Sequence, residues 1–372
     1  MKRRDILAKS AIASATAATV VGCRRFRGGG GSSAPGVQTG LPRIRWDMAT
    51  SWPKSLVIFD GAKTIAQRVS QITDGRFTIK AYAGGELVPP LGVLDAVQEG
   101  NIQCGHTASY FYIGKSPALA FATCVPFGFN AQQQNSWLYY GDGLKAIQKV
   151  YADQFKIINF PAGNTGTQMG GWFKKEIKSL VDLQGLKMRI PGLGGQVMKR
   201  LGVNVQVLPG SEIYLALDRG AIDAAEWVGP YDDEKIGLHN AAKFYCYPGW
   251  WEPGSTLDVL VNLKEWEKLP AEYRAAFSTA AYEANLNMLC QYEALNGKTL
   301  NKLVKNGTKL VPYSPDILQA AQKSAFEILD DNAAKNADFQ KIYEQWKSFR
   351  KDIYQWNNTN ELSFSKFVTS GD

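Results

Sequence analysis

Segments with strand periodicity alternate with segments of helix periodicity over the first third of the chain. Residues 44–49 and 76–82 alternate apolar and polar side chains, as half-buried strands do. Residues 55–72 carry apolar side chains at helical spacing, and residues 91–99 and 104–109 add a second helix and a third extended segment. Because consecutive parallel strands need a crossover connection, this order predicts a parallel sheet covered by helices.

The later part of the chain predicts a second α/β lobe and a return to the first sheet. Residues 156–160 have the pattern of a strand, residues 257–262 can rejoin the first sheet, and the chain after Pro270 is mostly helical. Roughly 330 residues follow the N-terminal segment, which is enough for two cores. A chain that crosses between two α/β lobes and comes back places a ligand in the cleft between them.

The N-terminus has the features of an export signal. Basic residues precede a mildly apolar run of small residues that is too short to span a membrane. Arg3 and Arg4 resemble a twin-arginine signal, and Cys23 closes a Val-Val-Gly-Cys sequence that resembles a bacterial lipobox. An incidental cysteine beside an ordinary cleavage site is the alternative. We expect residues 1–23 to be a signal peptide with a lipobox and residues 24–42 to be a flexible linker.

Most of the positive charge lies in this N-terminal segment. The formal net charge is +8, and residues 1–27 contribute +6 of it. The rest of the sequence has no basic stripe interleaved with aromatic residues, so we expect no nucleic-acid partner. Four further cysteines follow Cys23 without a CxxC pair, which disfavours a zinc site and leaves both disulfides and buried thiols open.

Residues 186–192, Leu-Lys-Met-Arg-Ile-Pro-Gly, place an arginine at the end of a short predicted strand. Pro191 favours an extended residue before it and Gly192 permits a sharp exit, so the Arg189 guanidinium would be held in a fixed place. Its planar fork can bind a carboxylate in two places. A structural ion pair is the alternative for a single buried arginine. Amide side chains upstream and a carboxylate downstream favour a small-anion site over that alternative.

Six segments of the chain carry a resemblance to a known family. They are residues 50–54, 84–87, 105–115, 163–172, 186–192 and 223–232. Together they resemble the solute-binding proteins of TRAP (tripartite ATP-independent periplasmic) transporters, in particular the branch that binds 2-oxo acids or lactate with a metal ion. The resemblance extends from about residue 43 to 360, and its motifs are specific in combination.

The resemblance implies an α/β, periplasmic-binding-protein-like fold with a ligand cleft between two lobes. Lobe I would comprise residues 43–162 and about 253–372, and lobe II residues 163–252. A long helix would link the lobes. The helical C-terminal region can also pair protomers into a homodimer in this branch of the family.

The same resemblance assigns roles to individual residues. Arg189 would bind the ligand carboxylate. The implied metal ligands are all oxygen donors: the side chains of Gln168, Glu226 and Glu252 and the backbone carbonyl of Trp227. Such donors, without His or Cys, suit sodium or calcium and disfavour zinc or copper. For Glu252 the alternative is a rim carboxylate beside core tryptophans.

Other side chains of these segments are candidates for further ligand contacts. They are Asn164, Tyr110 and Tyr112 for polar contacts to a carbonyl or hydroxyl, and Trp52, Trp227 and Trp251 for apolar walls. Core packing is the alternative for each aromatic residue. His106 and His239 lie in unrelated surroundings and suggest no catalytic triad.

These features predict an extracytoplasmic solute-binding protein. It would capture a small 2-oxo or 2-hydroxy monocarboxylate, similar to pyruvate or lactate, with a metal ion and deliver it to membrane permease subunits. We expect a periplasmic or extracytoplasmic location, a lipid anchor on Cys23 and export by the twin-arginine route. An enzyme acting on a small organic acid in the same cleft, or a ligand sensor, is the alternative. Since the sequence has no G-x-S-x-G elbow, metal-binding histidine cluster or phosphate loop, we predict no catalytic residues and no enzymatic activity.

Overall fold

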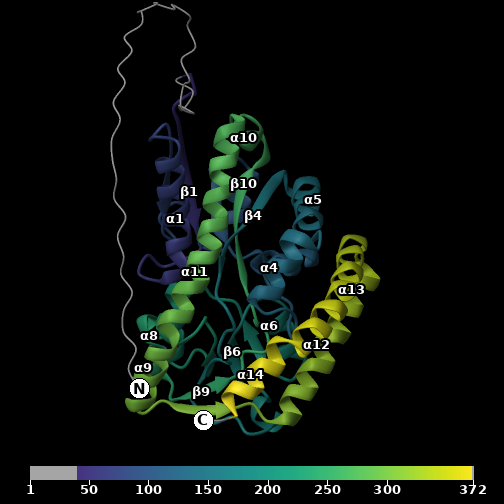
Figure 1. Ribbon diagram of the computed structural model, residues 1–372. Coiled ribbons are helices and arrows are strands. Elements are labelled where there is room, and N and C mark those ends of the chain that lie inside the picture. Colours follow the sequence, from purple (N-terminus) through teal and green to yellow (C-terminus); the bar gives the residue numbers. More distant parts are fainter. Residues whose placement is uncertain (1–39, 371–372) are drawn as a thin grey trace, which may run out of the picture. The chain divides into compact units, whose positions relative to one another are not determined.

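Residues 40–370, which the computed structural model describes, contain two β-sheets with helices packed around them (Figure 1). The predicted signal peptide, Cys23 and most of the predicted linker lie outside the described residues. The segment Leu41–Asp372 forms a compact unit. Within the described part of the chain, no helix combines the length and the apolar character needed to span a bilayer.

The first sheet has five strands in the order β2-β1-β3-β10-β4. They are β1 Ile44–Thr50, β2 Phe77–Tyr82, β3 Cys104–Thr107, β4 Ile157–Asn164 and β10 Thr256–Asn262. β1 pairs in parallel with both β2 and β3, which confirms the predicted parallel arrangement. The returning strand β10 lies antiparallel between β3 and β4, and all of its residues are buried.

Amphipathic helices supply the crossovers of the first sheet. α1 (Val57–Ile72) buries Ile58, Ala62 and Ile65, which follow helical spacing, and α2 (Val93–Gln98) connects β2 to β3. α11 (Ala271–Lys305), the predicted long helix, packs against α1 and β4 (Figure 1). Shorter helices of the same region are η1 Ser109–Tyr112, η2 Pro117–Leu119, α3 Ala120–Thr123, α4 Ala131–Tyr140, α5 Gly143–Phe155 and α10 Leu263–Glu267.

The second sheet has six short strands in the order β11-β9-β5-β8-β6-β7. They are β5 Trp172–Phe173, β6 Lys187–Arg189, β7 Asn204–Gln206, β8 Ala224–Ala225, β9 Phe244–Tyr247 and β11 Lys309–Pro312. β6 ends at Arg189, as the sequence predicts, and runs parallel to its neighbours β7 and β8. The helices that follow these strands are η3 Leu180–Leu183, α6 Gly192–Arg200, α7 Gly210–Asp218, α8 Pro230–Ile236 and α9 Leu238–Ala241.

One strand interrupts the region that the sequence predicts to be helical after Pro270. β11 follows α11 and adds a parallel edge strand beside β9. The prediction that this region is mostly helical is confirmed, but it did not include β11, because a four-residue run carries little periodicity and becomes a strand only through its tertiary pairing. The chain then continues through α12 (Pro315–Lys335), α13 (Ala337–Thr359) and α14 (Glu361–Thr369). The predicted lobe boundaries remain a prediction.

A buried carboxylate lies in the middle of the first sheet. Asp258, on β10, accepts hydrogen bonds from Ser109 Oγ at 2.5 Å and Asn159 Nδ2 at 2.9 Å. The Ser109 hydroxyl also lies 2.5 Å from the Tyr151 hydroxyl. Burial raises the pKa of Asp258 from 3.8 to about 7, although both hydrogen bonds pull it down.

This pKa predicts that the free energy of unfolding falls as pH rises from about 4 to about 7. The folded carboxyl keeps its proton in that window while the unfolded one has lost it, so the stabilisation is complete below the unfolded pKa and is lost as pH rises through the folded pKa. The loss from this group reaches about 1.4 kcal/mol per pH unit. Asp258→Asn keeps the shape and should reduce the slope, as measured by chemical denaturation at several pH values. Equal slopes in wild type and variant would contradict the prediction.

Candidate functional site

The parallel strands β6 and β8 bring an arginine and a glutamate together. Arg189 pairs with Ala225 in the strand register, and Glu226 follows directly after β8. Arg189 Nη1 donates to the backbone carbonyl of Glu226 at 3.0 Å and forms an ion pair with its carboxylate. Arg189 Nε donates to Leu208 O at 3.0 Å, and the guanidinium carbon lies 5.4 Å from the centre of the Trp227 ring. Arg189 and Glu226 are each 1% exposed, so the site is enclosed.

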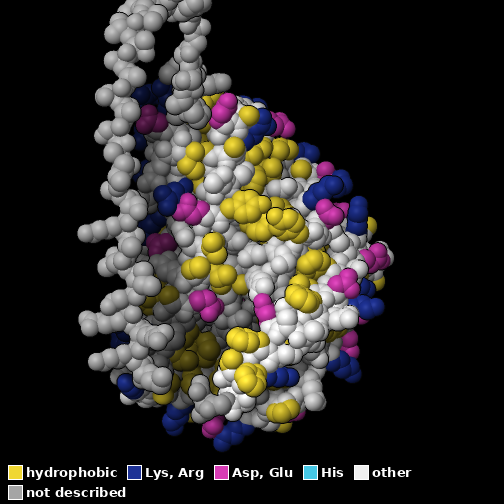
Figure 2. Space-filling model, in the orientation of Figure 1, with side chains coloured by type: hydrophobic (Ala, Val, Ile, Leu, Met, Phe, Trp, Pro, Cys, Tyr) yellow, Lys and Arg dark blue, Asp and Glu magenta, His cyan; other side chains and the backbone are white. Residues whose placement is uncertain are grey.

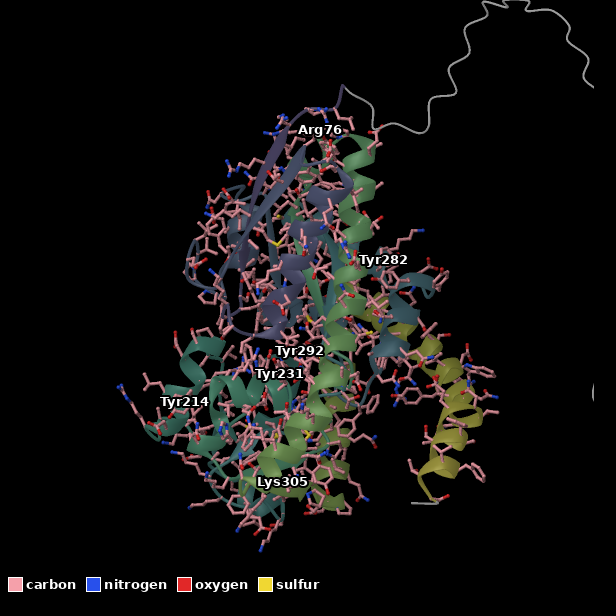
Figure 3. All side chains as sticks on the ribbon, turned by 60° about the vertical axis from the view of Figure 1, so that its left-hand side comes forward. Arg76, Tyr214, Tyr231, Tyr282, Tyr292 and Lys305 are labelled. Atoms are coloured by element: carbon pink, nitrogen blue, oxygen red, sulfur yellow. The ribbon has the colours of Figure 1, made fainter. Side chains whose placement is uncertain are left out.

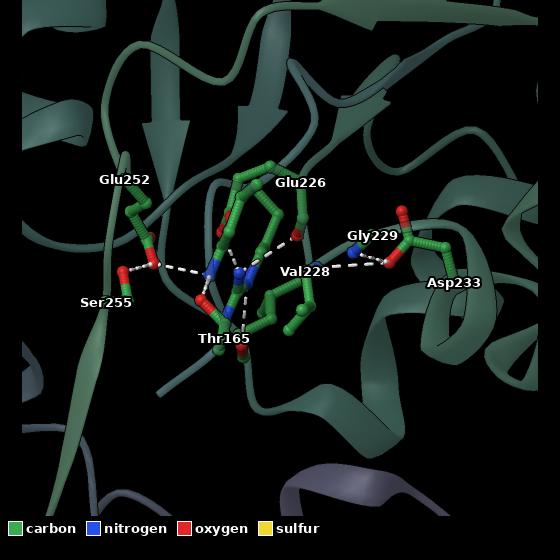
Figure 4. A network of polar contacts seen from close by, with 10 residues as sticks. Thr165, Glu226, Val228, Gly229, Asp233, Glu252 and Ser255 are labelled. Atoms are coloured by element: carbon green, nitrogen blue, oxygen red, sulfur yellow. Dashed lines mark hydrogen bonds and ion pairs between the residues drawn. The ribbon is translucent and has the colours of Figure 1, made fainter. Parts of the chain in front are cut away.

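Two of the connections between the sheets add an amide and a second carboxylate. Gln168 lies on the chain from β4 to β5, and Glu252 lies on the chain from β9 to β10. Gln168 Nε2 donates to Glu252 Oε2 at 2.7 Å and to Thr165 Oγ1 at 3.1 Å. Ser255 Oγ also donates to Glu252 Oε2, at 2.5 Å (Figure 4). Sequence reasoning missed Thr165 and Ser255, although Ser255 stands only three residues from Glu252.

Two buried oxygen atoms in this cluster have no hydrogen-bond partner. They are Gln168 Oε1 and Glu226 Oε2. The orientation of the Gln168 amide is fixed, because the opposite orientation would place its oxygen against a carboxylate oxygen of Glu252. Buried acceptors without donors are costly unless a cation or a proton satisfies them. Carboxylate and amide oxygens are the donors that calcium and sodium prefer, so these residues fit the predicted metal site.

Two buried carboxyl groups share one arginine in this cluster. Burial raises the pKa of Glu226 well above its usual value, with Arg189 lowering it and Glu252 raising it. Burial also raises the pKa of Glu252 to about 7, while Ser255 and Arg189 lower it. The described residues contain no group of three His, Cys, Asp or Glu side chains arranged around a metal position. A cation here would therefore be held by a mixed set of carboxylate, amide and backbone oxygens.

Aromatic side chains surround the cluster. Trp52 lies 6.4 Å from Trp227, ring centre to ring centre, and its Nε1 donates to His106 Nδ1 at 2.7 Å. Gly192 has a φ of +66°, and a Cβ at this position would lie 3.3 Å from the side chain of Tyr110, so the two residues are close neighbours. The Tyr110 hydroxyl also lowers the pKa of Glu252 through a hydrogen bond. The sequence candidates Trp52, Tyr110 and Trp227 are therefore grouped around the cluster.

The remaining candidates differ in how their polar atoms are used. Trp251 is buried and its Nε1 has no hydrogen-bond partner. Asn164 Nδ2 donates to Thr256 Oγ1 at 3.3 Å, and its Oδ1 accepts from the backbone amide of Gly166 at 2.9 Å. The Tyr112 hydroxyl lies 3.0 Å from Thr107 Oγ1 and accepts from the backbone amide of Leu94. Asn164 and Tyr112 are thus engaged in structural hydrogen bonds, and their ligand contacts remain predictions.

A cavity of about 330 Å³ adjoins Tyr110 and the residues that follow Arg189. Its apolar lining consists of Tyr110, Phe111, Ile113, Ile190, Pro191, Val205 and Val207. Gln196 and Lys199, both on α6, are its polar lining residues. The lining of the cavity therefore comes from η1, near the first sheet, and from α6 and the region of β7, which belong to the second sheet.

Residues 48–336 match the family described as bacterial extracellular solute-binding protein, family 7 (DctP). The chain belongs to this family. The match confirms the resemblance stated above, and the α/β architecture with its C-terminal helices agrees with solved structures of TRAP transporter solute-binding proteins.

Relatives of known description support the assignment to family 7. A monocarboxylate 2-oxoacid-binding periplasmic protein of Nostoc is 67% identical over 370 residues, which is 100% of both chains. A TRAP transporter solute-binding protein from Bordetella bronchiseptica is 45% identical with a TM-score of 0.87 over 89% of this chain and 98% of that one. It is a dimer that holds calcium and picolinate in one active site. A protein from Pseudoalteromonas atlantica, with sodium and pyruvate, is 38% identical with a TM-score of 0.84 over 87% and 99%.

Proposed function

We propose that this protein is the extracytoplasmic receptor of a TRAP transporter and captures a small 2-oxo or 2-hydroxy monocarboxylate together with calcium or sodium. The observation that supports this most is the buried ion pair of Arg189 with Glu226, together with two buried oxygens that lack a hydrogen-bond partner, Gln168 Oε1 and Glu226 Oε2. An arginine binds a carboxylate, and the oxygens bind a cation. The descriptions of the Nostoc, Bordetella and Pseudoalteromonas proteins, with a 2-oxoacid, picolinate or pyruvate as ligand, agree with this proposal.

Each residue of the proposed site has a separate role. Glu226 neutralises Arg189 in the ligand-free arrangement. With a cation held by Gln168, Glu226, Glu252 and the Trp227 carbonyl, the Glu226 carboxylate gains a second partner and Arg189 Nη1 becomes available to the ligand carboxylate. The metal supplies the positive charge that balances two carboxylates and the acid. Trp227 and Trp52 exclude water, which strengthens each of these charge interactions.

The net charge of the loaded site favours this arrangement. Arg189 contributes one positive charge, whereas Glu226, Glu252 and a monocarboxylate contribute three negative charges. A divalent ion brings the sum to zero and sodium leaves one negative charge, so both are compatible with the donors. Delivery of the acid to permease subunits is part of this proposal.

Occupancy of the native protein tests the proposal directly. Protein purified without refolding should carry a small organic acid and sodium or calcium, identified by mass spectrometry and elemental analysis. Incubation with pyruvate, lactate and picolinate should return each acid unchanged. Chemical conversion of the acid would favour the enzyme alternative, and loss of uptake on deletion of an adjoining permease gene would favour transport over sensing.

We further propose export through the Arg3-Arg4 signal and attachment to the membrane through a lipid on Cys23. The sequence Val-Val-Gly-Cys carries this proposal. Cys23→Ser should move the protein from the membrane fraction to the soluble exported fraction, as measured by fractionation and immunoblotting. A wild-type protein that is already fully soluble, with a mature N-terminus beyond residue 23, would contradict the anchor.

We also propose that the C-terminal helices pair two protomers. Phe364 and Phe367, on α14, are 68% and 80% exposed, and Trp356, at the end of α13, is 58% exposed. Hydrophobic side chains lie at the surface where Figure 1 places α14 (Figure 2). Large exposed aromatic residues on one helix are typical of an interface. Analytical ultracentrifugation of the wild type should show a dimer, and a strictly monomeric protein would contradict the pairing.

A further inference from the structure

Two neighbouring aspartates in the first turn of α8 follow the segment that carries the candidate metal ligands. The second of them, Asp233, faces the second sheet. It accepts hydrogen bonds from Trp172 Nε1 at 2.9 Å and from the Tyr245 hydroxyl at 2.7 Å. It also accepts from the backbone amides of Val228 and Gly229 at 3.1 and 3.0 Å (Figure 4). Asp233 thus fixes the backbone directly after the candidate ligands to the second sheet.

The first of them, Asp232, faces the other way, toward helices that pack on the first sheet. Its carboxylate accepts from the backbone amides of Val57 and Ile58, the first residues of α1, at 3.0 and 3.4 Å. It also accepts from the hydroxyl of Tyr292, on α11, at 2.7 Å. The residue before α1, Leu56, provides no side-chain cap, so Asp232 is the capping group of this helix.

Further contacts join α8 to the loop before α1 and to α11. Lys235 Nζ, one turn along α8, donates to Ser55 O at 3.0 Å. Tyr231, also on α8, donates its backbone amide to Asn296 Oδ1 of α11 at 3.1 Å. Figure 3 labels Tyr231 and Tyr292 close together where α8 meets α11. The loop before α1 also carries Trp52, which packs on Trp227. This loop therefore contacts both the site and α8.

The site cannot be reached by an acid in the arrangement seen. The exposed fractions of Arg189, Glu226, Gln168 and Glu252 are 1, 1, 4 and 3%. Ligand entry therefore requires the elements around the two sheets to move apart, and capture requires them to return. Contacts that cross between these elements determine how strongly the closed arrangement is favoured.

We propose, building on the receptor function above, that Asp232 is a positioning residue that holds α8 against the first turn of α1 when the site is closed. Asp233 fixes α8 to the second sheet, so the two carboxylates together link the ligand-binding loop to the first-sheet helices. When the elements around the two sheets close on a ligand bound beside Glu226 and Trp227, the same movement brings Asp232 to the backbone amides of α1. The contact stabilises the closed arrangement and not the open one.

The effect expected from Asp232 follows from the contacts it makes. A carboxylate that accepts backbone amides at a helix N-terminus also benefits from the helix dipole. Asp232→Asn keeps the size of the side chain but removes the charge and one acceptor. We expect pyruvate affinity in the presence of calcium to fall about tenfold, because the closed fraction of the protein falls.

The test measures closure and affinity separately. Spin labels on Lys80→Cys (β2) and Leu215→Cys (α7), two exposed positions, report the distance between the sheets when Cys23 and Cys290 are serine. Pulsed electron paramagnetic resonance should show longer distances for Asp232→Asn than for wild type, with and without pyruvate and calcium. Glu234→Gln is the matched control: it lies on the same helix and removes a more exposed ion pair, with Lys302 of α11, so it shows how much the loss of a surface charge between α8 and α11 changes the distances.

Each outcome decides the proposal. Longer distances and weaker binding, with the thermal midpoint of the ligand-free protein changed no more than by Glu234→Gln, support it. Unchanged distances with a lower midpoint would show a static structural contact and overturn it. If Asp232→Asn does not fold, Tyr292→Phe removes one hydrogen bond from the same carboxylate and replaces it in the test. If wild type binds neither pyruvate nor calcium, the receptor proposal fails, and the ligand-free distances alone still decide the role of Asp232.

Discussion

Replacing Arg189 with alanine should weaken binding of pyruvate, or of the acid found in the native protein, at least about a hundredfold, on the order of 3 kcal/mol. The guanidinium is 1% exposed, so water does not replace it as partner of the ligand carboxylate. Arg189→Lys should restore only part of the affinity, because an ammonium keeps the charge but not the planar fork. Isothermal titration calorimetry of both variants measures the effect.

Arg189→Ala should also lower the free energy of unfolding, and this effect has to be separated from the loss of binding. Arg189→Ala leaves the carboxylate of Glu226 buried without its cationic partner, which costs about 3–5 kcal/mol of stability when one member of a buried pair is removed. The double variant Arg189→Ala with Glu226→Gln removes both charges and should recover much of the thermal midpoint without recovering affinity. If Arg189→Ala binds the acid as tightly as wild type, the carboxylate is bound elsewhere.

Glu226→Gln should abolish cation binding and weaken acid binding with it, by about a hundredfold. The amide keeps the shape of the side chain but loses the negative charge that a hard cation requires. Acid binding falls too, because in this site the cation offsets the repulsion between Glu252 and the ligand carboxylate. Calcium and pyruvate titrations, each in the presence and absence of the other, measure the coupling.

The matched control for this variant is Glu212→Gln, an exposed carboxylate on α7 that should change neither titration. The thermal midpoint of the ligand-free Glu226→Gln protein should fall, because the buried Arg189 loses its anionic partner and keeps only its bond to the backbone carbonyl of residue 226. A variant that loses pyruvate binding but keeps calcium binding would place the metal away from Glu226.

The parts of the site that could be predicted are those fixed by local chemistry. Pro191 and Gly192 end the strand after Arg189 wherever that strand is placed, so the position of the guanidinium at a strand end follows from the sequence. The alternation of strands and crossover helices likewise determines the parallel pairing of β1, β2 and β3. The returning strand β10 could be recognised from its apolar and β-branched composition, with Leu257 followed by Val-Leu-Val at residues 259–261.

The parts that could not be predicted depend on contacts between distant residues. Gln168 donates to Glu252, which lies 84 residues later in the chain, only because two of the connections between the sheets lie side by side. β11 becomes a strand only through its pairing with β9. Asp232 caps a helix that begins 175 residues earlier in the chain, a relation for which no local pattern exists. The buried ion pair of Arg189 with Glu226 is the structural alternative that the sequence left open, and the ligand-binding role of Arg189 remains a proposal.

The central claim is that the acid binds together with a cation held by Gln168, Glu226 and Glu252. Calorimetric titration of pyruvate into wild-type protein tests it most directly, first in sodium-free buffer after removal of bound metal and ligand with a chelator, and then after calcium or sodium is restored. We predict no measurable binding heat in the metal-free sample and full recovery with one of the two ions. Undiminished affinity in the metal-free sample would contradict the claim.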